Sequence, residues 1–188
     1  PSGYLCAQIL LSHDDVKSRD RYLNARATLQ TLLDKGVIPI VNENDTVVTD
    51  EIRFGDNDRL AAQVASLCDA NILILLSDVD GLYSSDPNIN LNAMHIPLVE
   101  DITSRIEQMA TEKKSGFSKG GMRTKIEAAK ASVAAGCHMV IADGSSANPI
   151  LAVSKGKKST WFISSGNPID ARKQWIFNTK PKGKIYID

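Results

Sequence analysis

Short apolar runs alternate along this 188-residue chain with segments of helical periodicity, and this alternation limits the possible folds more than any other feature. The runs Val37–Val41 and Ile72–Leu76 contain no polar residue, so they lack the in-and-out pattern of a half-exposed strand. Continuous runs of this kind are typical of parallel strands that helices cover on both faces. The sequence therefore predicts an α/β fold, a three-layer α/β/α sandwich around a mainly parallel central sheet.

The predicted elements cover most of the chain as one domain, and 43% hydrophobic residues are enough to build its core. Because Pro1 rather than a methionine opens the sequence, we expect the chain to be a fragment. Strands are predicted at 4–11, 37–41, 72–76, 138–142, 159–163 and 184–187, and helices at 14–35, 57–70, 102–111, 119–135 and 170–176.

The cysteines and the hydropathy favour an intracellular protein. Cys6, Cys68 and Cys137 are odd in number, far apart and set in apolar surroundings, which indicates reduced core thiols rather than a disulfide framework. No run approaches the ~20 apolar residues of a membrane span, and no leader resembles a signal peptide. We expect a cytoplasmic location and no membrane partner.

Charge is unevenly distributed along the chain. Residues 1–94 contain 7 Lys and Arg against 14 Asp and Glu, a net charge of −7, and residues 95–188 contain 15 against 8, a net charge of +7. The basic residues have no interleaved aromatic residues, so no nucleic-acid partner is expected. The phosphates of a nucleotide account for them, and simple surface solvation is the alternative for most. They include Lys113, Lys114, Lys119, Arg123, Lys125, Lys155, Lys157 and Lys158.

Three of the predicted strands are followed by polar clusters, at residues 42–45, 77–80 and 143–146. In open α/β sheets, ligands bind beyond the carboxyl ends of the strands. Ser77 and Asp78 follow the most apolar strand, where they suit either a nucleotide contact or an ordinary turn.

The segment Gly120–Lys125 reads GGMRTK and begins a predicted helix. Adjacent glycines let backbone N–H groups approach a phosphate, the start of a helix carries partial positive charge, and Lys125 adds a mobile cation. Met122 stands where a Walker A loop needs lysine, and no GxGxxG motif occurs. The segment predicts a phosphate-binding corner of another type, with a simple glycine turn as the alternative.

Two amide and carboxylate pairs, Asn44–Asp45 and Asn57–Asp58, form a candidate polar site. If they converge, they can hold a substrate ammonium group or position lysines that contact phosphate. Helix capping is the alternative near residue 57. The three histidines show neither metal-ligand spacing nor a catalytic triad. No dedicated metal site is predicted, because Mg²⁺ usually arrives with the phosphates of ATP.

Five segments together resemble the bacterial glutamate 5-kinases of the amino-acid kinase family. The resemblance covers nearly the whole chain, and its first two segments are the most specific. It implies a carbamate-kinase-like fold and the ATP-dependent phosphorylation of the γ-carboxylate of L-glutamate to L-glutamyl 5-phosphate, the first step of proline biosynthesis. The segments are 37–45 (VIPIVNEND), 54–60 (FGDNDRL), 75–83 (LLSDVDGLY), 120–125 (GGMRTK) and 172–176 (RKQWI).

The resemblance also implies residue roles. Asp45 and Asn57 match glutamate-binding positions, with Asn44 beside them. Asp58 matches a residue that orients the catalytic lysines, and Lys125 matches the lysine that stabilises the transferring phosphoryl group. A homo-oligomer and feedback inhibition by proline are implied as well. The implied ATP-binding residues are Ser77, Asp78, Lys119, Gly120, Gly121, Met122, Arg123, Thr124 and Lys125.

The chain also departs from the family pattern. Ser77 replaces a frequent threonine, and Lys119 stands where a small or hydroxyl residue is common. Residues 1–188 match the C-terminal two-thirds of the kinase domain, without the family's opening strand and its phosphate-binding lysine, and without the C-terminal accessory domain. Two alternatives therefore stay open: a catalytically silent nucleotide-binding fragment, and a family member that acts on a different acceptor.

Overall fold

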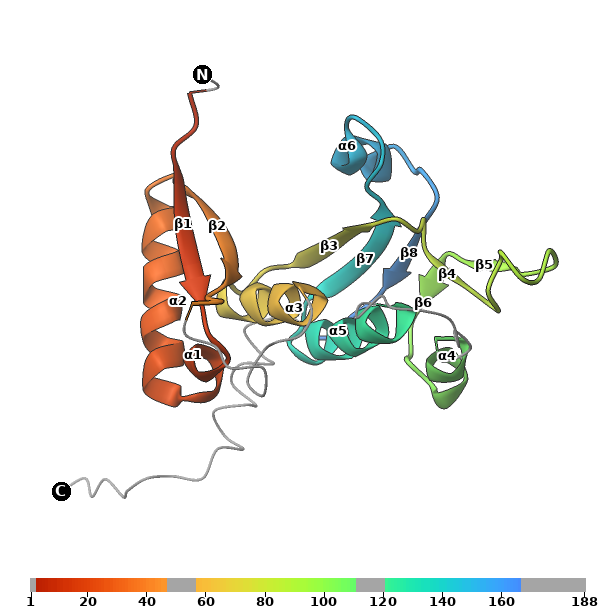
Figure 1. Cartoon of the computed structure of the whole chain (residues 1–188), viewed down its shortest axis with the longest axis horizontal. Helices are drawn as coiled ribbons and strands as arrows, with labels where there is room; N and C mark the ends of the chain where they lie inside the picture. Colours follow the sequence, from red (N-terminus) through yellow and green to blue (C-terminus); the bar gives the residue numbers. More distant parts are fainter. Residues whose placement is uncertain (1–2, 47–56, 111–120, 167–188) are drawn as a thin grey trace.

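The chain follows the predicted alternation of strands and helices (Figure 1). The computed structural model describes residues 3–46, 57–110 and 121–166. The strands are β1 (Cys6–Leu11), β2 (Ile38–Glu43), β3 (Ile72–Ser77), β4 (Leu82–Tyr83), β5 (His95–Ile96), β6 (Leu98–Val99), β7 (His138–Asp143) and β8 (Ser159–Phe162). The helices are α1 (His13–Lys17), α2 (Arg19–Asp34), α3 (Asn57–Leu67), α4 (Ser104–Met109), α5 (Met122–Ala134) and α6 (Pro149–Ser154).

The described strands form three sheets. β1 and β2 pair in parallel, and the largest sheet has the order β3-β7-β8-β6. Within it, β3 pairs with β7 and β6 with β8 in parallel, whereas β7 and β8 are antiparallel. β4 and β5 form a short antiparallel hairpin. Because Ser77 lies opposite Asp143 in the β3–β7 register, the polar clusters that follow these two strands meet at one sheet edge. The cluster that follows β2 belongs to a different sheet.

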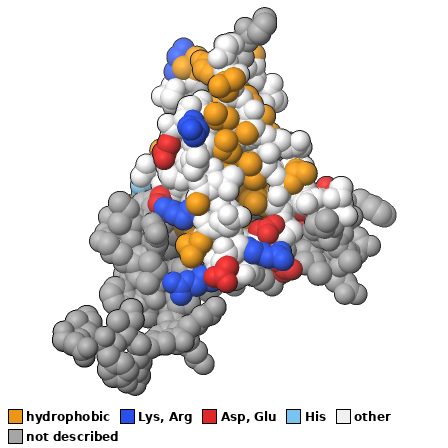
Figure 2. All heavy atoms as spheres, turned by 90° about the vertical axis from the view of Figure 1, so that its left-hand side faces the viewer, with side chains coloured by type: hydrophobic (Ala, Val, Ile, Leu, Met, Phe, Trp, Pro, Cys, Tyr) orange, Lys and Arg blue, Asp and Glu red, His pale blue; other side chains and the backbone are white. Residues whose placement is uncertain are grey.

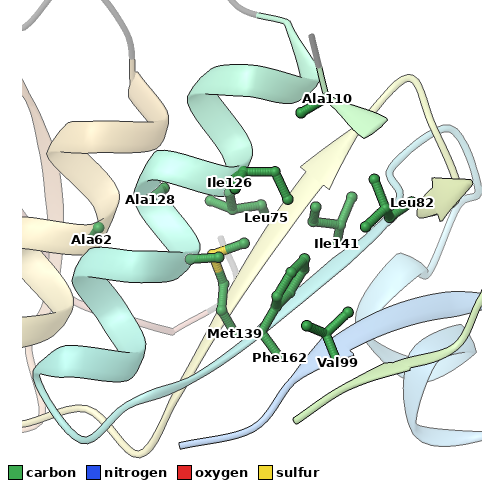
Figure 3. Packing of buried hydrophobic residues seen from close by; sticks show 11 residues of the cluster. Ala62, Leu75, Leu82, Val99, Ala110, Ile126, Ala128, Met139, Ile141 and Phe162 are labelled. Atoms are coloured by element: carbon green, nitrogen blue, oxygen red, sulfur yellow. The ribbon is translucent and has the colours of Figure 1, made fainter. Parts of the chain in front are cut away.

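Helices cover both faces of the largest sheet, as the predicted three-layer fold requires. Met139 and Ile141 of β7 point into a core shared with Ile126 of α5 and Ala62 of α3 (Figure 3). The alternate β7 residues Val140 and Ala142 pack instead against Val153 of α6 and are also buried. Burial on both faces explains why the sequence of this strand shows no alternation.

A second core lies between α2, α3 and the β1–β2 sheet. It contains Leu11 of β1, Leu29 of α2, and Leu60 and Leu67 of α3, all of them 4% exposed or less. α3 therefore contributes side chains to both cores, because its buried Ala62 packs with the first. It is the helix that links the core of the largest sheet to that of the β1–β2 sheet.

The other face of the β1–β2 sheet is not covered within the described part of the chain. Leu10, Ile38 and Ile40, called here the uncovered sheet face, are 43%, 47% and 58% exposed. Figure 2 views the side of the molecule that carries β1 and α2 and shows hydrophobic side chains gathered there in one band. The apolar run in β2 predicted cover on both faces, and the described residues supply it on one.

Several predicted boundaries need correction. The helix predicted at 14–35 is interrupted at Ser18, whose extended backbone separates α1 from α2. Short elements without a strong periodic pattern were not predicted: β4, β5, β6 and α6, which has Pro149 at its start. The predicted helix at 170–176 and strand at 184–187 lie outside the described residues. No described helix combines the length and the apolar character that a bilayer crossing requires.

The three cysteines are free thiols, as predicted, but they do not share one environment. Cys137 is buried, and burial raises the pKa of its thiol to about 11. Cys68 is half-buried, and burial raises its pKa too. The expectation of a core position is wrong for Cys6, which is exposed because it lies on the open face of β1.

Candidate active site

A nearly buried ion pair joins the first turns of α3 and α5. Lys125 Nζ lies 3.0 Å from Asp58 Oδ2, and the two side chains are 11% and 14% exposed. Asp58 is the second residue of α3 and Lys125 the fourth of α5, and these helices pack along each other. A charge held this far from water needs its partner, so the carboxylate fixes the position of the ammonium group.

The hydroxyl group of Thr124 contacts the same Asp58 carboxylate. Its Oγ1 lies 3.0 Å from Asp58 Oδ2 and 2.8 Å from the carbonyl oxygen of Gly121, and its single proton can serve one of them at a time. Asp58 thus receives contacts from two consecutive residues of α5. The family resemblance implied that Asp58 orients the catalytic lysines, and the structure brings Asp58 and Lys125 together.

The start of α5 is open for an anion. Gly121 precedes the helix with φ −108°, a conformation that any residue adopts, and a Cβ added there meets no atom of the described residues within 4 Å. The first turn itself contains no acidic residue, and its backbone N–H groups carry partial positive charge, while the Asp58 carboxylate of α3 contacts the side chains of Thr124 and Lys125. This arrangement suits a phosphate. Lys119 and Gly120, predicted to join this site, lie outside the described residues.

A cavity of about 520 Å³ lies beside this helix start. It brings together four of the predicted ATP-binding residues, Asp78, Gly121, Met122 and Lys125, from the carboxyl end of β3 and the start of α5. A volume of this size suits a small-molecule or cofactor ligand. Among the described residues, the lining consists of Asp78, Val79, Asp80, Gly81, Leu82, Tyr83, Ser85, Asp86, Pro87, Asn88, Met109, Ala110, Gly121, Met122, Lys125 and Asp143.

Three other predicted nucleotide residues do not line the cavity. Ser77 lies at its edge, where its hydroxyl donates to Asp78 Oδ1 at 3.0 Å. Thr124 contacts Asp58 instead. Arg123 is 75% exposed and turns along α5 to Glu127, with 3.2 Å between Nε and Oε1. Arg59 of α3 also contacts Glu127, and its hydrogen bond is the main cause of the lowered pKa of that carboxyl group.

The predicted substrate residues lie at the end of β2 and at the start of α3. Asn44 follows β2, where its backbone N–H donates to the carbonyl oxygen of Leu11 at 2.9 Å and its Oδ1 accepts from Thr46 at 2.7 Å. Asp45 is exposed. Asn57 begins α3 and precedes Asp58 in sequence. None of the three lines the cavity, so their shared role in one binding site stays a prediction.

Sequence reasoning missed one wall of the cavity, which comes from the β3–β4 turn, the β4–β5 loop and the end of α4. Tyr83, Pro87, Met109 and Ala110 belong to it. Tyr83 was part of a quoted motif and could have been proposed, whereas nothing in the sequence around Met109 separates it from an ordinary core residue. In the described residues, no group of three His, Cys, Asp or Glu side chains is arranged to hold a metal ion.

Comparison with known proteins identifies the family of this arrangement. The model of the amino acid kinase family matches residues 1–143. The "Glutamate 5-kinase" of Paracoccus denitrificans is 57% identical over 188 residues, which are 100% of this chain and 51% of that protein. The protein of the same name from Agrobacterium fabrum is 52% identical over 185 residues, 98% of this chain and 48% of that protein. The chain spans about half the length of the curated relatives it matches.

Solved structures agree at the level of the fold. The carbamate kinase from Giardia lamblia bound to AMP-PNP has a TM-score of 0.57 at 18% identity and covers 86% of this chain and 62% of its own. An isopentenyl phosphate kinase substrate complex has a TM-score of 0.54 at 20% identity, with 85% and 60% covered. The matched family model, with the fold of these neighbours, shows that the chain belongs to the amino acid kinase family.

Proposed function

We propose that the chain carries the nucleotide and phosphoryl-transfer part of a glutamate 5-kinase, which uses ATP to phosphorylate the γ-carboxylate of L-glutamate and begins proline biosynthesis. The observation that carries this proposal is the Asp58–Lys125 pair at the open start of α5, beside a cavity of nucleotide size. The names and identities of the curated relatives support the choice of glutamate as the acceptor.

The proposed reaction does not need a general base. A glutamate side chain has an unperturbed pKa of about 4.3, so the attacking carboxylate is already ionised at neutral pH. The difficulty is to bring this anion in line with a terminal phosphate and to offset the charge on the transferring group. Lys125 supplies a cation for this purpose, and Asp58, which also accepts a hydrogen bond from Thr124, holds that cation in place.

ATP would place its phosphates at the start of α5 and its base in the cavity. The space beside Gly121, open among the described residues, and a first turn without acidic residues of its own fit an anion there. Mg²⁺ would arrive with the phosphates and offset part of their charge. Asp78, a carboxylate at the sheet edge that lines the cavity, is the side chain we assign to it.

Glutamate would be held by Asp45, Asn57 and Asn44, whose acceptor oxygens suit its ammonium group. The same proposal includes a cytoplasmic, homo-oligomeric enzyme that proline inhibits. These points rest on the resemblance to glutamate 5-kinases, because the contacts of one chain do not address them.

A second candidate is a nucleotide-binding unit that does not transfer phosphate by itself. It is favoured by one observation: the chain matches only about half the length of its curated relatives, while its described residues already line a cavity of about 520 Å³.

The deciding experiment uses the full-length product of the gene and residues 1–188 in parallel. Each is incubated with Mg·ATP and a panel of acceptors: L-glutamate, L-aspartate, N-acetyl-L-glutamate and UMP. ADP release is followed, and acyl phosphate is trapped as the hydroxamate. We expect glutamate-dependent ADP and hydroxamate from the full-length product. ATP binding without either product in both proteins would support the second candidate, and preference for another acceptor would replace glutamate.

A further inference from the structure

Two consecutive lysines in the turn between α6 and β8 each contact an aspartate that lines the cavity. Lys157 Nζ lies 2.8 Å from Asp143 Oδ2, and Lys158 Nζ lies 3.5 Å from Asp80 Oδ2. Asp143 ends β7, whereas Asp80 lies in the turn between β3 and β4. The lysine pair therefore connects two separate walls of the cavity from outside.

The contacts of both lysines extend to other groups of these walls. Asp143 also accepts a hydrogen bond from the backbone N–H of Ser145 at 2.9 Å, and the bond from Lys157 is the main cause of its lowered pKa. Lys158 Nζ lies 2.5 Å from the hydroxyl of Tyr83 and 4.7 Å from the centre of its ring. The Tyr83 hydroxyl in turn donates to Asp80 at 2.9 Å. Lys158, Tyr83 and Asp80 form one connected group.

These contacts matter for ligand binding because the described lining of the cavity is mainly acidic. Its described lining contains four aspartates, Asp78, Asp80, Asp86 and Asp143, against a single lysine, Lys125. Lys125 already balances Asp58, which lies outside the lining. Along this described lining, a nucleoside triphosphate would therefore meet mainly charge of its own sign, unless other cations offset the aspartates.

We propose that Lys157 and Lys158 set the affinity of this cavity for nucleoside polyphosphates, by neutralising Asp143 and Asp80 and holding the two walls together. The inference rests on the proposed nucleotide site and adds two residues that no motif assigned. The lysines need not touch the ligand, because a positive charge at the mouth of a cavity lowers the repulsion between its carboxylates and an incoming anion.

If Lys157 and Lys158 contributed only to folding, their replacement would have little effect on ligand binding by the folded protein. The two lysine side chains are 42% and 48% exposed, and exposed ion pairs contribute little to folding stability. Their replacement should leave the fold intact, which separates a binding effect from unfolding. Lys155 provides a matched control: it is exposed, it lies in the same turn, and it forms no ion pair within the described residues.

The experiment measures Mg·ATP binding by isothermal titration to the full-length gene product carrying Lys157→Met, Lys158→Met, both changes, or Lys155→Met. We expect each single change to weaken binding about threefold to tenfold at low salt, and the double change to weaken it more. Raising the ionic strength to about 0.5 M should reduce these differences, because salt screens exposed charges. Lys→Arg variants, which keep the charge, should restore most of the affinity.

Two results would overturn the inference: binding by the double variant equal to that of Lys155→Met, or tighter binding, which would mean that the free carboxylates recruit the metal of Mg·ATP. The proposed function is judged separately, by glutamate-dependent ADP release from the unmodified protein. If that protein turns over glutamate and the lysine variants bind Mg·ATP unchanged, the inference alone fails. If the unmodified protein does not bind ATP, both fail.

Discussion

Lys125 carries its ammonium group on the first turn of α5, nearly withdrawn from solvent against Asp58. We expect Lys125→Ala to lower kcat about 100-fold or more, because loss of one fixed group that stabilises transition-state charge has an effect of this size. The KM for glutamate should change less than threefold. Initial rates measured with saturating ATP over a range of glutamate concentrations test this.

The same helix supplies the control for Lys125. Lys130 lies on α5, is 44% exposed and pairs with Glu107. Lys130→Ala should keep kcat within about twofold, since exposed pairs contribute little. Removal of Lys125 takes away a cationic partner that lies 3.0 Å from the nearly buried Asp58 and is expected to lower the free energy of unfolding by up to about 3 kcal/mol. Thermal melts must therefore show that the variant is folded at the assay temperature. A kcat equal to that of the parent would remove Lys125 from the mechanism.

A change at Asp45 tests the proposed glutamate-binding part of the site. It is exposed at the end of the β2 segment and does not line the cavity. If it binds the ammonium group of glutamate, Asp45→Asn should raise the KM for glutamate about tenfold or more, since a charge-assisted hydrogen bond is lost. ATP affinity should not change. Titration with each ligand checks both statements, and Asp20→Asn, an exposed position on α2, is the control. Unchanged glutamate binding would contradict the assignment.

Among the elements, the β3–β4 turn depends most on a single glycine. Gly81 has φ +150°, and a Cβ added there would lie 2.5 Å from Thr160 Oγ1 and 2.7 Å from His95 Nε2. Thr160 cannot move away easily, because it is fully buried and its hydroxyl accepts from the N–H of Leu82 and donates to the carbonyl of Ile96, each at 2.7 Å. The glycine is therefore required by close packing.

We expect Gly81→Ala to destabilise the protein by about 2 kcal/mol or more, through strain and overpacking together. It should also weaken ATP binding, because the displaced turn lines the cavity. Gly156→Ala is the matched control: φ is +79° there and no atom lies within 4 Å of the added Cβ, so only the backbone preference of about 1 kcal/mol is lost. Urea unfolding gives the comparison, and equal losses for the two variants would refute the packing argument.

The elements that sequence reasoning found are those with a strong local pattern. β3, β7, α3 and α5 appear within a few residues of their predicted bounds, since apolar runs and helical periodicity are properties of the chain itself. β4, β5 and β6 have two residues each, too few to show a period. The break at Ser18 was missed because the apolar positions on either side continue one helical pattern.

The contacts of the site also differ in how well the sequence predicts them. The resemblance to glutamate 5-kinases implied that Asp58 orients Lys125, and in the structure Asp58 Oδ2 and Lys125 Nζ lie 3.0 Å apart. The ion pair between Lys157 and Asp143 could not be predicted, since 14 residues separate the two and no periodicity connects them. Such contacts depend on how the β7 end and the α6–β8 turn come together in space.

For the whole molecule, the uncovered sheet face predicts how residues 1–188 behave alone. Leu10, Ile38 and Ile40 present apolar surface to solvent, and such patches mark contact sites or promote aggregation. We expect residues 1–188 to bind a hydrophobic dye such as ANS. The double change Ile38→Thr and Ile40→Thr should reduce dye fluorescence with less than about 1 kcal/mol loss of stability, because both side chains are about half exposed and threonine favours strands.

Val41→Thr is the control on the same strand, because Val41 faces the second core. It should lower stability by about 1 kcal/mol or more, as a hydroxyl enters an apolar contact, and leave dye binding to the native state unchanged. Dye binding that persists in the double variant would place the responsible surface elsewhere. The full-length gene product gives a further comparison, since weaker dye binding there would indicate that additional polypeptide covers this face.

Because α3 contributes side chains to both cores, ligand binding near α3 should also stabilise the β1–β2 sheet. A ligand held by Lys125 stabilises every conformation that keeps α3 and α5 docked, and undocking α3 would also open the β1–β2 sheet that rests on it. Nucleotide should therefore slow amide hydrogen exchange in β1 and β2, although neither strand reaches the cavity. Binding of nucleotide in the cavity would then be detected as slower exchange of amide protons in β1 and β2, at the other end of the protein.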